Sequence, residues 1–271
     1  MERILASLTR GKSTSHFFSK LIPNHYQYPL SSFRNVEVRG VKLTVDIGDY
    51  IGHCIYFGFT GTEWKSYEKL FSLCQPSFHV LDIGANIGYT SLVMSTLVGN
   101  GAVVGFEPDP FSYQQLLQNY KKNPEIKVKC LNVGLGEKSS SAFLEERLVT
   151  CRGANRIAVG DTKGIEIKLE TLDTIFTELN FKTLELIKID VEGYELKILK
   201  GGKSILSQFK PTLFIEVDES NLRDQGDSAY GLISFLSEIG YNTFVQVDTE
   251  TSISLATNFE DCHFDLIAQA K

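Results

Sequence analysis

The sequence predicts an α/β fold: a doubly wound, seven-stranded and mostly parallel sheet with its last strand antiparallel, preceded by a small N-terminal lead-in of helix and β-hairpin. From Phe78 onward, short apolar runs alternate with helix-like segments. Strands that are apolar along their whole length and separated by helices are typical of a parallel sheet buried on both faces. The last two runs are too close together for a helix between them. We therefore expect the final strand to return antiparallel.

Composition narrows the class of protein. The 271 residues are 42% hydrophobic and 22% charged, which is ordinary for a soluble globular protein. The net charge is −6 without any lysine–arginine run, which argues against a nucleic-acid partner because phosphates need clustered positive charge. The five cysteines are widely spaced and form no C-x-x-C pair, so we expect reduced thiols in the cytoplasm. No segment approaches the ~18 apolar residues of a membrane span.

Residues 1–77 are predicted to form a lead-in that packs on the main domain, which would span residues 78–271. Alternating apolar and polar residues at 36–47, on both sides of Arg39-Gly40, indicate a β-hairpin. Residues 62–74 have helical spacing. A weak amphipathic helix near the N-terminus is expected to pack on the body or on a second copy in a homodimer. Its apolar residues would be Ile4, Leu5, Leu8, Phe17, Phe18 and Leu21.

The main domain begins with a strand at 78–83 and continues by alternation. Further strands are predicted at 102–107, 126–131, 184–190, 212–217, 242–247 and 263–268. Helices are predicted up to residue 97, at 110–122, after residue 190 up to 206, and at 230–239. An insert at about 134–171 breaks this pattern, with extra strands at 141–144 and 165–169 around a flexible segment, 151–164. We expect the insert to select the acceptor, because long loops on an open sheet tend to carry specificity.

The first chemical signal is the stretch from Asp82 to Gly88, which reads D-I-G-A-N-I-G. Its glycines allow a tight strand-to-helix turn and a close approach of the backbone to a ligand. The spacing is not the G-x-G-x-x-G of pyrophosphate-binding loops. A carboxylate just before the first glycine suits a ligand with an ammonium or sulfonium charge. The alternative is a plain glycine turn capped by Asp82.

The second signal is Glu107, which ends the second strand 25 residues after Asp82. A carboxylate at this place can accept hydrogen bonds from both ribose hydroxyls of a nucleoside. The alternative is an exposed Glu107 followed by a helix that Asp109 caps.

The third signal is the stretch from Lys188 to Glu195, which reads K-I-D-V-E-G-Y-E. Carboxyl ends of parallel strands line the ligand crevice of a doubly wound sheet, so Asp190 and Glu192 could orient an acceptor hydroxyl and take its proton. The alternative is that Asp190 caps a helix that Glu192 opens.

Together these stretches resemble the FkbM-type family of methyltransferases that depend on S-adenosylmethionine (SAM). The resemblance covers about residues 51–217. It rests on V-L-D-I-G-A-N-I-G-Y-T at 80–90, F-E-P-D at 106–109, N-V-G-L-G at 132–136, T-L-D at 171–173, and I-K-I-D-V-E-G-Y-E-L-K-I-L-K-G-G at 187–202. The last stretch, followed by Pro211 and I-E-V at 215–217, is the specific one.

The resemblance implies the seven-stranded, Rossmann-like SAM methyltransferase sheet and a set of cofactor-binding residues. The methionine end of SAM would lie against the first loop, the ribose on Glu107, and the adenine near Phe111 and the end of the third strand. The expected cofactor-binding residues are Asp82, Gly84, Ala85, Asn86, Gly88, Thr90, Glu107, Pro108, Phe111, Asn132 and Val133.

Methyl transfer to a hydroxyl needs a base, because a hydroxyl is a poor nucleophile. Asp190 is the first choice, and Glu192 and Glu216 are the second. His53 is a rival, because an imidazole titrates near neutral pH and residues 50–54 could fold over the site as a lid. A divalent metal could bind Asp190, Glu192 and Glu216 but is not expected.

The leading hypothesis is therefore O-methylation of a sugar or a natural-product small molecule. One alternative is N-methylation of a peptide or amine, and another is a non-catalytic SAM-binding module that acts through a partner. A nicotinamide-dependent dehydrogenase is disfavoured by the missing G-x-G-x-x-G. Neither the segment 151–164 nor residues 1–35 fall in the family pattern, so the sequence leaves the acceptor unidentified.

Overall fold

The computed structural model describes residues 2–9, 17, 19–58, 61–148, 150–160 and 163–270. Its main sheet has seven strands in the order β12-β13-β11-β10-β3-β4-β5, with every pair parallel except those made by β13. This confirms the predicted fold class. The strands are β3 (His79–Ile83), β4 (Ala102–Phe106), β5 (Val128–Leu131), β10 (Leu186–Ile189), β11 (Thr212–Asp218), β12 (Thr243–Gln246) and β13 (His263–Gln269).

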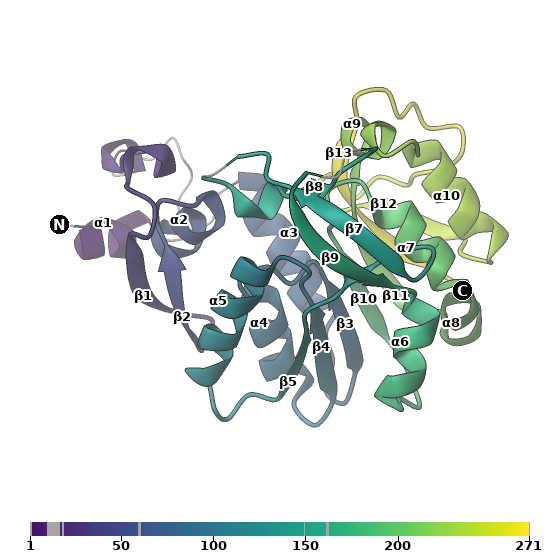
Figure 1. The fold of residues 1–271 in the computed structure, drawn as a ribbon, viewed down its shortest axis with the longest axis horizontal. Helices are drawn as coiled ribbons and strands as arrows, with labels where there is room; N and C mark the ends of the chain where they lie inside the picture. Colours follow the sequence, from purple (N-terminus) through teal and green to yellow (C-terminus); the bar gives the residue numbers. More distant parts are fainter. Residues whose placement is uncertain are drawn as a thin grey trace.

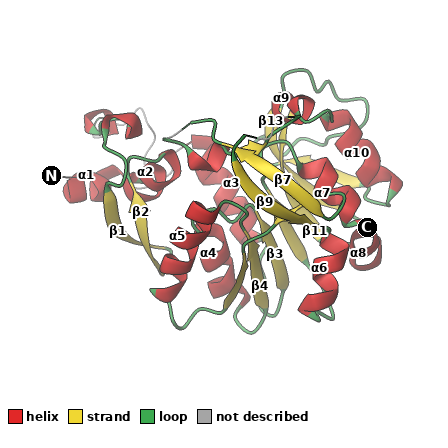
Figure 2. Cartoon of the chain, viewed as in Figure 1, coloured by secondary structure: helices red, strands yellow, loops and turns green. Residues whose placement is uncertain are grey.

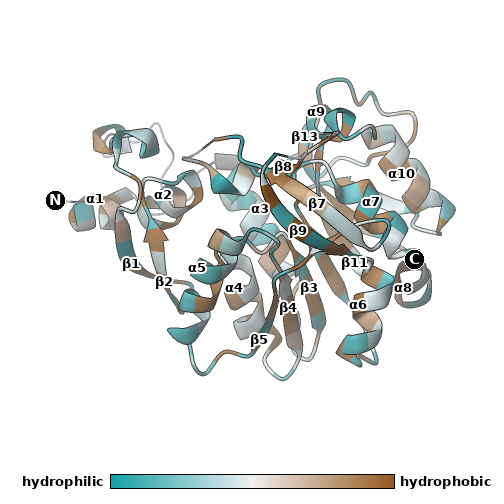
Figure 3. Ribbon diagram, viewed as in Figure 1, coloured by the Kyte–Doolittle hydropathy of each residue, from teal (hydrophilic) through white to brown (hydrophobic). Residues whose placement is uncertain are grey.

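Helices cover both faces of this sheet (Figures 1 and 2). One face carries α3 (Gly61–Ser72), α4 (Tyr89–Val98) and α5 (Pro110–Lys121). The other carries α6 (Leu172–Leu179), α7 (Glu195–Gly201), α8 (Lys203–Phe209), α9 (Glu219–Asp224) and α10 (Ala229–Glu238). Each face has its own apolar core, and the central strands contribute to both. Figure 3 shows this layering as apolar strands between helices with polar outer faces.

The lead-in contains α1 (Glu2–Thr9), the hairpin of β1 (Phe33–Val38) and β2 (Val41–Asp46), and α2 (Tyr50–Phe57), with short 3-10 turns η1 (Ser19–Leu21) and η2 (His25–Gln27). The predicted hairpin is confirmed, and Arg39 and Gly40 form its turn with φ of 51° and 78°. Of the apolar residues predicted for the N-terminal helix, Ile4 is 65% exposed, and Phe18 lies outside the described residues.

Side chains of α5 and of the turn that follows it join β2 to the main domain. The Asn123 amide both accepts from the Lys42 N–H and donates to the Lys42 carbonyl, each at 2.8 Å. The Asn119 side chain accepts from Thr44 N–H at 2.8 Å. Both asparagines are completely buried. They replace the strand that would otherwise pair with the outer edge of β2.

The insert forms a second sheet in the order β6-β9-β7-β8. Its strands are β6 (Gly134–Leu135), β7 (Ser140–Glu145), β8 (Arg156–Ile157) and β9 (Ile165–Glu170), with a 3-10 turn η3 (Arg152–Ala154). The two strands predicted at 141–144 and 165–169 correspond to β7 and β9. The two short strands were not predicted.

One local prediction is wrong, and one helix was not predicted. The helix after β10 begins at Glu195 rather than at Glu192, because Glu192 and Gly193 have φ of 57° and 99° and turn the chain first. Residues 50–54 lie in α2, whose N-terminus is capped by the Asp49 side chain. Among the described residues, no helix is both long and apolar enough to cross a membrane.

Candidate active site

A cavity of about 570 Å³ opens at the carboxyl ends of the central strands. Its walls come from the loops after β3, β4 and β10, from β11 and β13, from α3 and from the insert. Residues predicted from the sequence supply much of this lining. They are Gly84, Ala85, Asn86, Thr90, Glu107, Pro108, Val133, Asp190, Glu192 and Glu216.

The loop after β3, called here the donor loop (residues 84–88), has no room for a side chain at Gly84. Its φ is 82°, and a Cβ there would lie 1.9 Å from the Asp190 carbonyl oxygen. The Gly84 and Ala85 N–H groups both donate to the Phe106 carbonyl, at 3.0 and 2.9 Å. The loop is therefore fixed between β4 and the end of β10, and its backbone lines the cavity.

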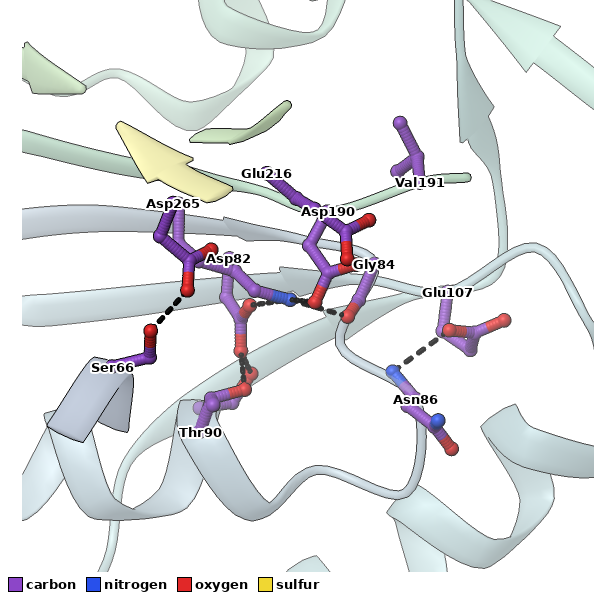
Figure 4. A network of polar contacts seen from close by, with 12 residues as sticks. Ser66, Asp82, Gly84, Asn86, Thr90, Glu107, Asp190, Val191, Glu216 and Asp265 are labelled. Atoms are coloured by element: carbon purple, nitrogen blue, oxygen red, sulfur yellow. Dashed lines mark hydrogen bonds and ion pairs between the residues drawn. The ribbon is translucent and has the colours of Figure 1, made fainter. Parts of the chain in front are cut away.

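Glu107 is held at the end of β4 by backbone N–H groups. One carboxylate oxygen accepts from Asn86 N–H at 2.8 Å (Figure 4). The other accepts from Asp109 N–H at 2.8 Å. Burial raises the pKa of Glu107 to about 7. Asn132 supports this strand end, because its amide donates to the carbonyls of Glu107 and Pro108 at 2.8 and 3.1 Å. Each Glu107 oxygen keeps a lone pair that can accept from a ligand.

Asp82 lies beneath the donor loop and not on the cavity wall. Its side chain is completely buried, and one oxygen accepts from Thr90 and Ser91 hydroxyls at 2.7 and 2.5 Å. The expectation that Asp82 touches the ligand is thus corrected. Asp82 is in register with Lys188 and faces the same side of the sheet as Asp190, but α4 and Lys188 cover it, while the loop after it meets the cavity. Through these contacts, Asp82 holds the donor loop and α4 together.

Lys188 connects Asp82 to the cavity. Its ammonium donates to the Gly84 carbonyl at 2.9 Å and lies 3.1 Å from an Asp190 oxygen and 3.6 Å from an Asp82 oxygen (Figure 4). The side chain is almost fully buried. Burial opposes its charge, but Asp190 and Asp82 together raise the pKa of Lys188 above its usual range.

Three carboxylates form a row across neighbouring strands, which we call the carboxylate row: Asp190, Glu216 and Asp265. Glu216 pairs with Asp265 in the ladder between β11 and β13. Asp190 follows Ile189, whose partner Ile215 precedes Glu216. Residues in one register position face the same side of a sheet, so the three side chains converge (Figure 4). Glu192 joins them from the loop after β10, where Asn221 donates to it at 2.8 Å.

Burial and mutual repulsion raise the pKa of the carboxyl groups beside Asp190. Burial, followed by the charge of Asp190, raises the pKa of Glu192 to about 7. The same two causes hold the pKa of Glu216 well above its ordinary value. Burial raises the pKa of Asp265 to about 6 against the opposing hydrogen bond from Ser66 on α3. Near neutral pH, the row can therefore hold protons as well as accept them.

The insert lines the cavity and is tied to the lead-in and to the start of α5. Arg152 N–H donates to the Asp49 side chain at 2.9 Å, and the Asn155 amide donates to Asp109 at 3.1 Å. Arg152, Asn155 and Arg156 all line the cavity. That the insert selects the acceptor stays a prediction.

Other predicted site residues lie away from the cavity wall. Phe111 is 60% exposed, and its ring lies against the Arg152 guanidinium at 4.8 Å. Gly88 caps α4 with a left-handed φ of 87°. His53 faces the lead-in, where a ring nitrogen is 2.9 Å from the Pro23 carbonyl, and burial lowers its pKa. Its position on α2 directs it away from the carboxylate row, which corrects the prediction of His53 as a base.

Sequence reasoning missed several lining residues. They are Ser66, Asp248, His263 and Asp265. The alternation of His263 and Asp265 on the last strand was the available signal, because both side chains face the same side as Glu216. Within the described ranges, no group of three or more potential ligands could hold a metal ion.

The family model described as the methyltransferase FkbM domain matches residues 82–243. The chain belongs to this family. The match includes the donor loop, Glu107, the insert and two members of the carboxylate row. The FkbM-type resemblance seen in the sequence is therefore confirmed, and the chain carries a methyltransferase domain.

Curated relatives of this FkbM-family chain are methyltransferases. The hexuronic acid methyltransferase AglP of Haloferax volcanii is 30% identical over 126 residues, which cover 46% of this chain and 50% of the relative. Methyltransferase sdnD of Sordaria araneosa is 28% identical over 153 residues, which cover 45% of this chain and 59% of the relative. The chain thus spans about half the length of the curated relatives that it matches.

Solved structures give distant likenesses. The methyltransferase FkbM of Methylobacillus flagellatus is 18% identical with a TM-score of 0.46, covering 74% of this chain and 50% of that chain. The TYW2 protein of M. jannaschii, solved in complex with AdoMet, is 12% identical with a TM-score of 0.44, covering 90% and 87%.

Proposed function

We propose that this protein transfers a methyl group from SAM to a hydroxyl of a sugar or another small natural product, with Asp190 as the base. The observation that carries the proposal is the layout of the cavity. Glu107 lies on the β4 side of the donor loop, and the carboxylate row lies on its other side. A nucleoside on one side would place its reactive methyl toward carboxylates on the other.

The residues present fit SAM. Glu107 has two fixed oxygens with spare lone pairs for the two ribose hydroxyls. The side-chain-free Gly84 lets the backbone approach the ligand closely. Carboxylates on the opposite wall favour a ligand that carries a sulfonium and an ammonium. A cavity of about 570 Å³ is in the usual range for a ligand of this size.

The chain's own groups would orient the acceptor and remove its proton. SAM supplies an activated methyl, so the protein has mainly to bring acceptor oxygen and methyl into line. Asp190 is partly exposed at the cavity and held by Lys188 at 3.1 Å. It can accept the hydroxyl proton as the new C–O bond forms, which leaves S-adenosylhomocysteine (SAH) and a methyl ether. Glu192 and Glu216 can accept from further acceptor hydroxyls.

A sugar acceptor draws support from one relative. The Haloferax volcanii relative is named for hexuronic acid, and the region it shares with this chain is 30% identical. A polyol also suits the site, because several carboxyl groups can accept from neighbouring hydroxyls.

N-methylation of an amine is the second candidate, favoured by the number of carboxylates that could hold an ammonium group. The Asp190→Asn variant distinguishes O-methylation from N-methylation. Loss of turnover with SAH binding intact indicates oxygen as the acceptor atom, because an amine is a better nucleophile and depends less on a base.

The decisive experiment is incubation with methyl-labelled SAM and fractionated small molecules and glycans. Mass spectrometry should find a product that has gained one methyl group, with the Asp190→Asn variant as the control. A protein that binds SAH but methylates no fraction would favour a non-catalytic SAM-binding module.

We also place the protein in the cytoplasm. The support is that Cys54, Cys74, Cys130, Cys151 and Cys262 are all free thiols. Expression in the native host with cell fractionation tests this.

A further inference from the structure

We propose that Lys188 is a positioning residue that links the donor loop to the candidate base: one of its N–H groups fixes the Gly84 carbonyl, and another holds the Asp190 carboxylate in place. This inference rests on the proposed function for the identity of donor and base. Nothing in the family match assigns a role to this side chain. The geometry that carries it lies at the junction of β3 and β10 (Figure 4).

The distances from the Lys188 ammonium show that it does more than neutralise the charge of buried Asp82. The Lys188 ammonium is 2.9 Å from the Gly84 carbonyl and 3.1 Å from Asp190, but 3.6 Å from Asp82. The two shorter contacts are both with cavity-lining residues. Lys188 lies at a central register position, between Asp82 on β3 and Phe214 on β11. A buried ammonium with three donors can satisfy all three oxygens at once.

The charges around Asp190 explain why it needs a cation. Titratable groups approach from every neighbouring element, and apart from Tyr67 they are acidic. They are Asp82 on β3, Glu216 on β11, Asp265 on β13, Tyr67 on α3, Glu195 on α7 and Glu192 on the adjoining loop. Repulsion from Asp190 raises the pKa of both Glu192 and Glu216. Lys188 is the cation that adjoins Asp190 and offsets this negative charge.

Lys188 also couples the two halves of the reaction. The Gly84 carbonyl belongs to the loop that would carry the methionine end of the donor, and a Cβ at Gly84 would overlap the Asp190 carbonyl. Donor loop and base therefore lie against each other, and the ammonium is hydrogen-bonded to both. A shift of either part would lengthen a contact to Lys188.

The test must avoid leaving a buried charge alone. Asp82 is completely buried, and one of its oxygens makes no hydrogen bond with any described residue, so Lys188→Met by itself could prevent folding. The Asp82→Asn variant keeps an acceptor for Thr90 and Ser91. The comparison is therefore between Asp82→Asn and the double variant Asp82→Asn, Lys188→Met, with thermal unfolding to show that both are folded.

Two measurements are made on this pair, and neither needs an acceptor. Calorimetry should show SAH binding roughly three- to tenfold weaker in the double variant, because the donor loop has lost a hydrogen bond. Carbon-13 NMR of protein labelled at aspartate carboxyl groups, with Asp190→Asn to assign the signal, should show a higher pKa of Asp190 in the double variant. In the single variant Lys188→Arg, which keeps the charge, the Asp190 pKa should stay near the wild-type value.

The results separate the two proposals. If the double variant loses only thermal stability, with SAH affinity and Asp190 titration unchanged, Lys188 is merely structural and the inference is overturned. A change in only one measurement also overturns it, because the link requires both. If wild-type protein does not bind SAH, the proposed function fails, while the NMR comparison still decides whether Lys188 controls Asp190.

Discussion

Gly84 shows how a single residue sets the shape of the site. Two separate constraints act on it: a left-handed φ of 82° and the Asp190 carbonyl 1.9 Å from where a Cβ would lie. Gly226 has nearly the same φ, 79°, but open space around it. Comparing substitutions at the two glycines therefore separates the energetic cost of backbone strain from the cost of steric overlap.

We expect Gly84→Ala to lower the free energy of unfolding by at least about 2 kcal/mol more than Gly226→Ala, which should cost about 1 kcal/mol. Urea denaturation of both variants measures this difference. Equal losses would show that the donor loop can relax away from β10.

Glu107 should make donor binding depend on pH. Its pKa in the free protein is raised to about 7 by burial. Ribose hydroxyls donate to the ionised carboxylate, so binding lowers this pKa and releases a proton. SAH affinity should therefore rise as pH increases through about 7 and level off above it, by calorimetry between pH 5.5 and 8.5.

The matched control is Glu195, whose pKa burial also raises to about 7 but which does not line the cavity. Glu107→Gln should weaken SAH binding and remove most of its pH dependence, while Glu195→Gln should keep the dependence. A pH profile that is unchanged in Glu107→Gln would place the ribose elsewhere.

At the residue scale, sequence reasoning found the residues that follow strands and missed those that depend on pairing. Glu107 and Asp190 were found because each directly ends an apolar run. Asp82 was placed on the cavity wall because a linear motif does not show that α4 and Lys188 cover its side chain. Asp265 was missed because its neighbour Glu216 lies 49 residues earlier and is reached only through the antiparallel register. Their exact roles toward SAM stay predictions.

At the element scale, the position of the insert depends on Asp49, the residue that caps α2. Asp49 caps α2 with one oxygen, which accepts from Ile51 N–H at 3.1 Å, and its other oxygen accepts from Arg152 N–H at 2.9 Å. The side chain thus holds the insert against the lead-in. Because the insert lines the cavity, loss of this contact should change access to the cavity.

We expect Asp49→Ala to lose about 1 kcal/mol of stability and to speed hydrogen exchange at residues 150–157. Ser228→Ala, which removes the cap of the remote helix α10, should cost a similar stability without changing exchange in the insert. Hydrogen-exchange mass spectrometry compares the two. Unchanged protection of the insert in Asp49→Ala would mean that other contacts hold it.

The prediction of helices and strands was limited by the length of each element and by its surroundings. Long apolar strands and the periodic helices were predicted because burial on one or both faces leaves a repeating pattern. The two-residue strands β6 and β8 carry no such pattern. Helix α2 was not predicted because its sequence, Y-I-G-H-C-I-Y-F, is short, contains glycine and is apolar on several sides.

On the scale of the whole molecule, the lead-in and the main domain share one core. Val41, Leu43 and Val45 of β2 belong to the same buried cluster as Val80 of β3 and Leu92 of α4. The buried amides of Asn119 and Asn123 complete the junction. The lead-in and the main domain thus follow one another along the chain but share one packed core. That residues 77 and 78 mark a domain boundary stays a prediction.

We expect the double variant Asn119→Ala, Asn123→Ala to lose about 2–4 kcal/mol, because backbone groups of β2 are left buried without partners. Unfolding should remain a single transition, since both parts share apolar contacts. Differential scanning calorimetry measures this. A separate early transition would show that the lead-in unfolds on its own.

The order of the sheet has a consequence for synthesis. β13 is the last strand along the chain, yet it lies between β11 and β12. Until residues 263–269 have left the ribosome, the edge of β11 must stay unpaired, and unpaired edges invite aggregation. A nascent chain whose donor loop has already been synthesised would still lack Asp265 of the carboxylate row. We therefore expect ribosome-bound chains arrested before residue 263 to need a chaperone and to close the sheet only after residues 263–269 have emerged.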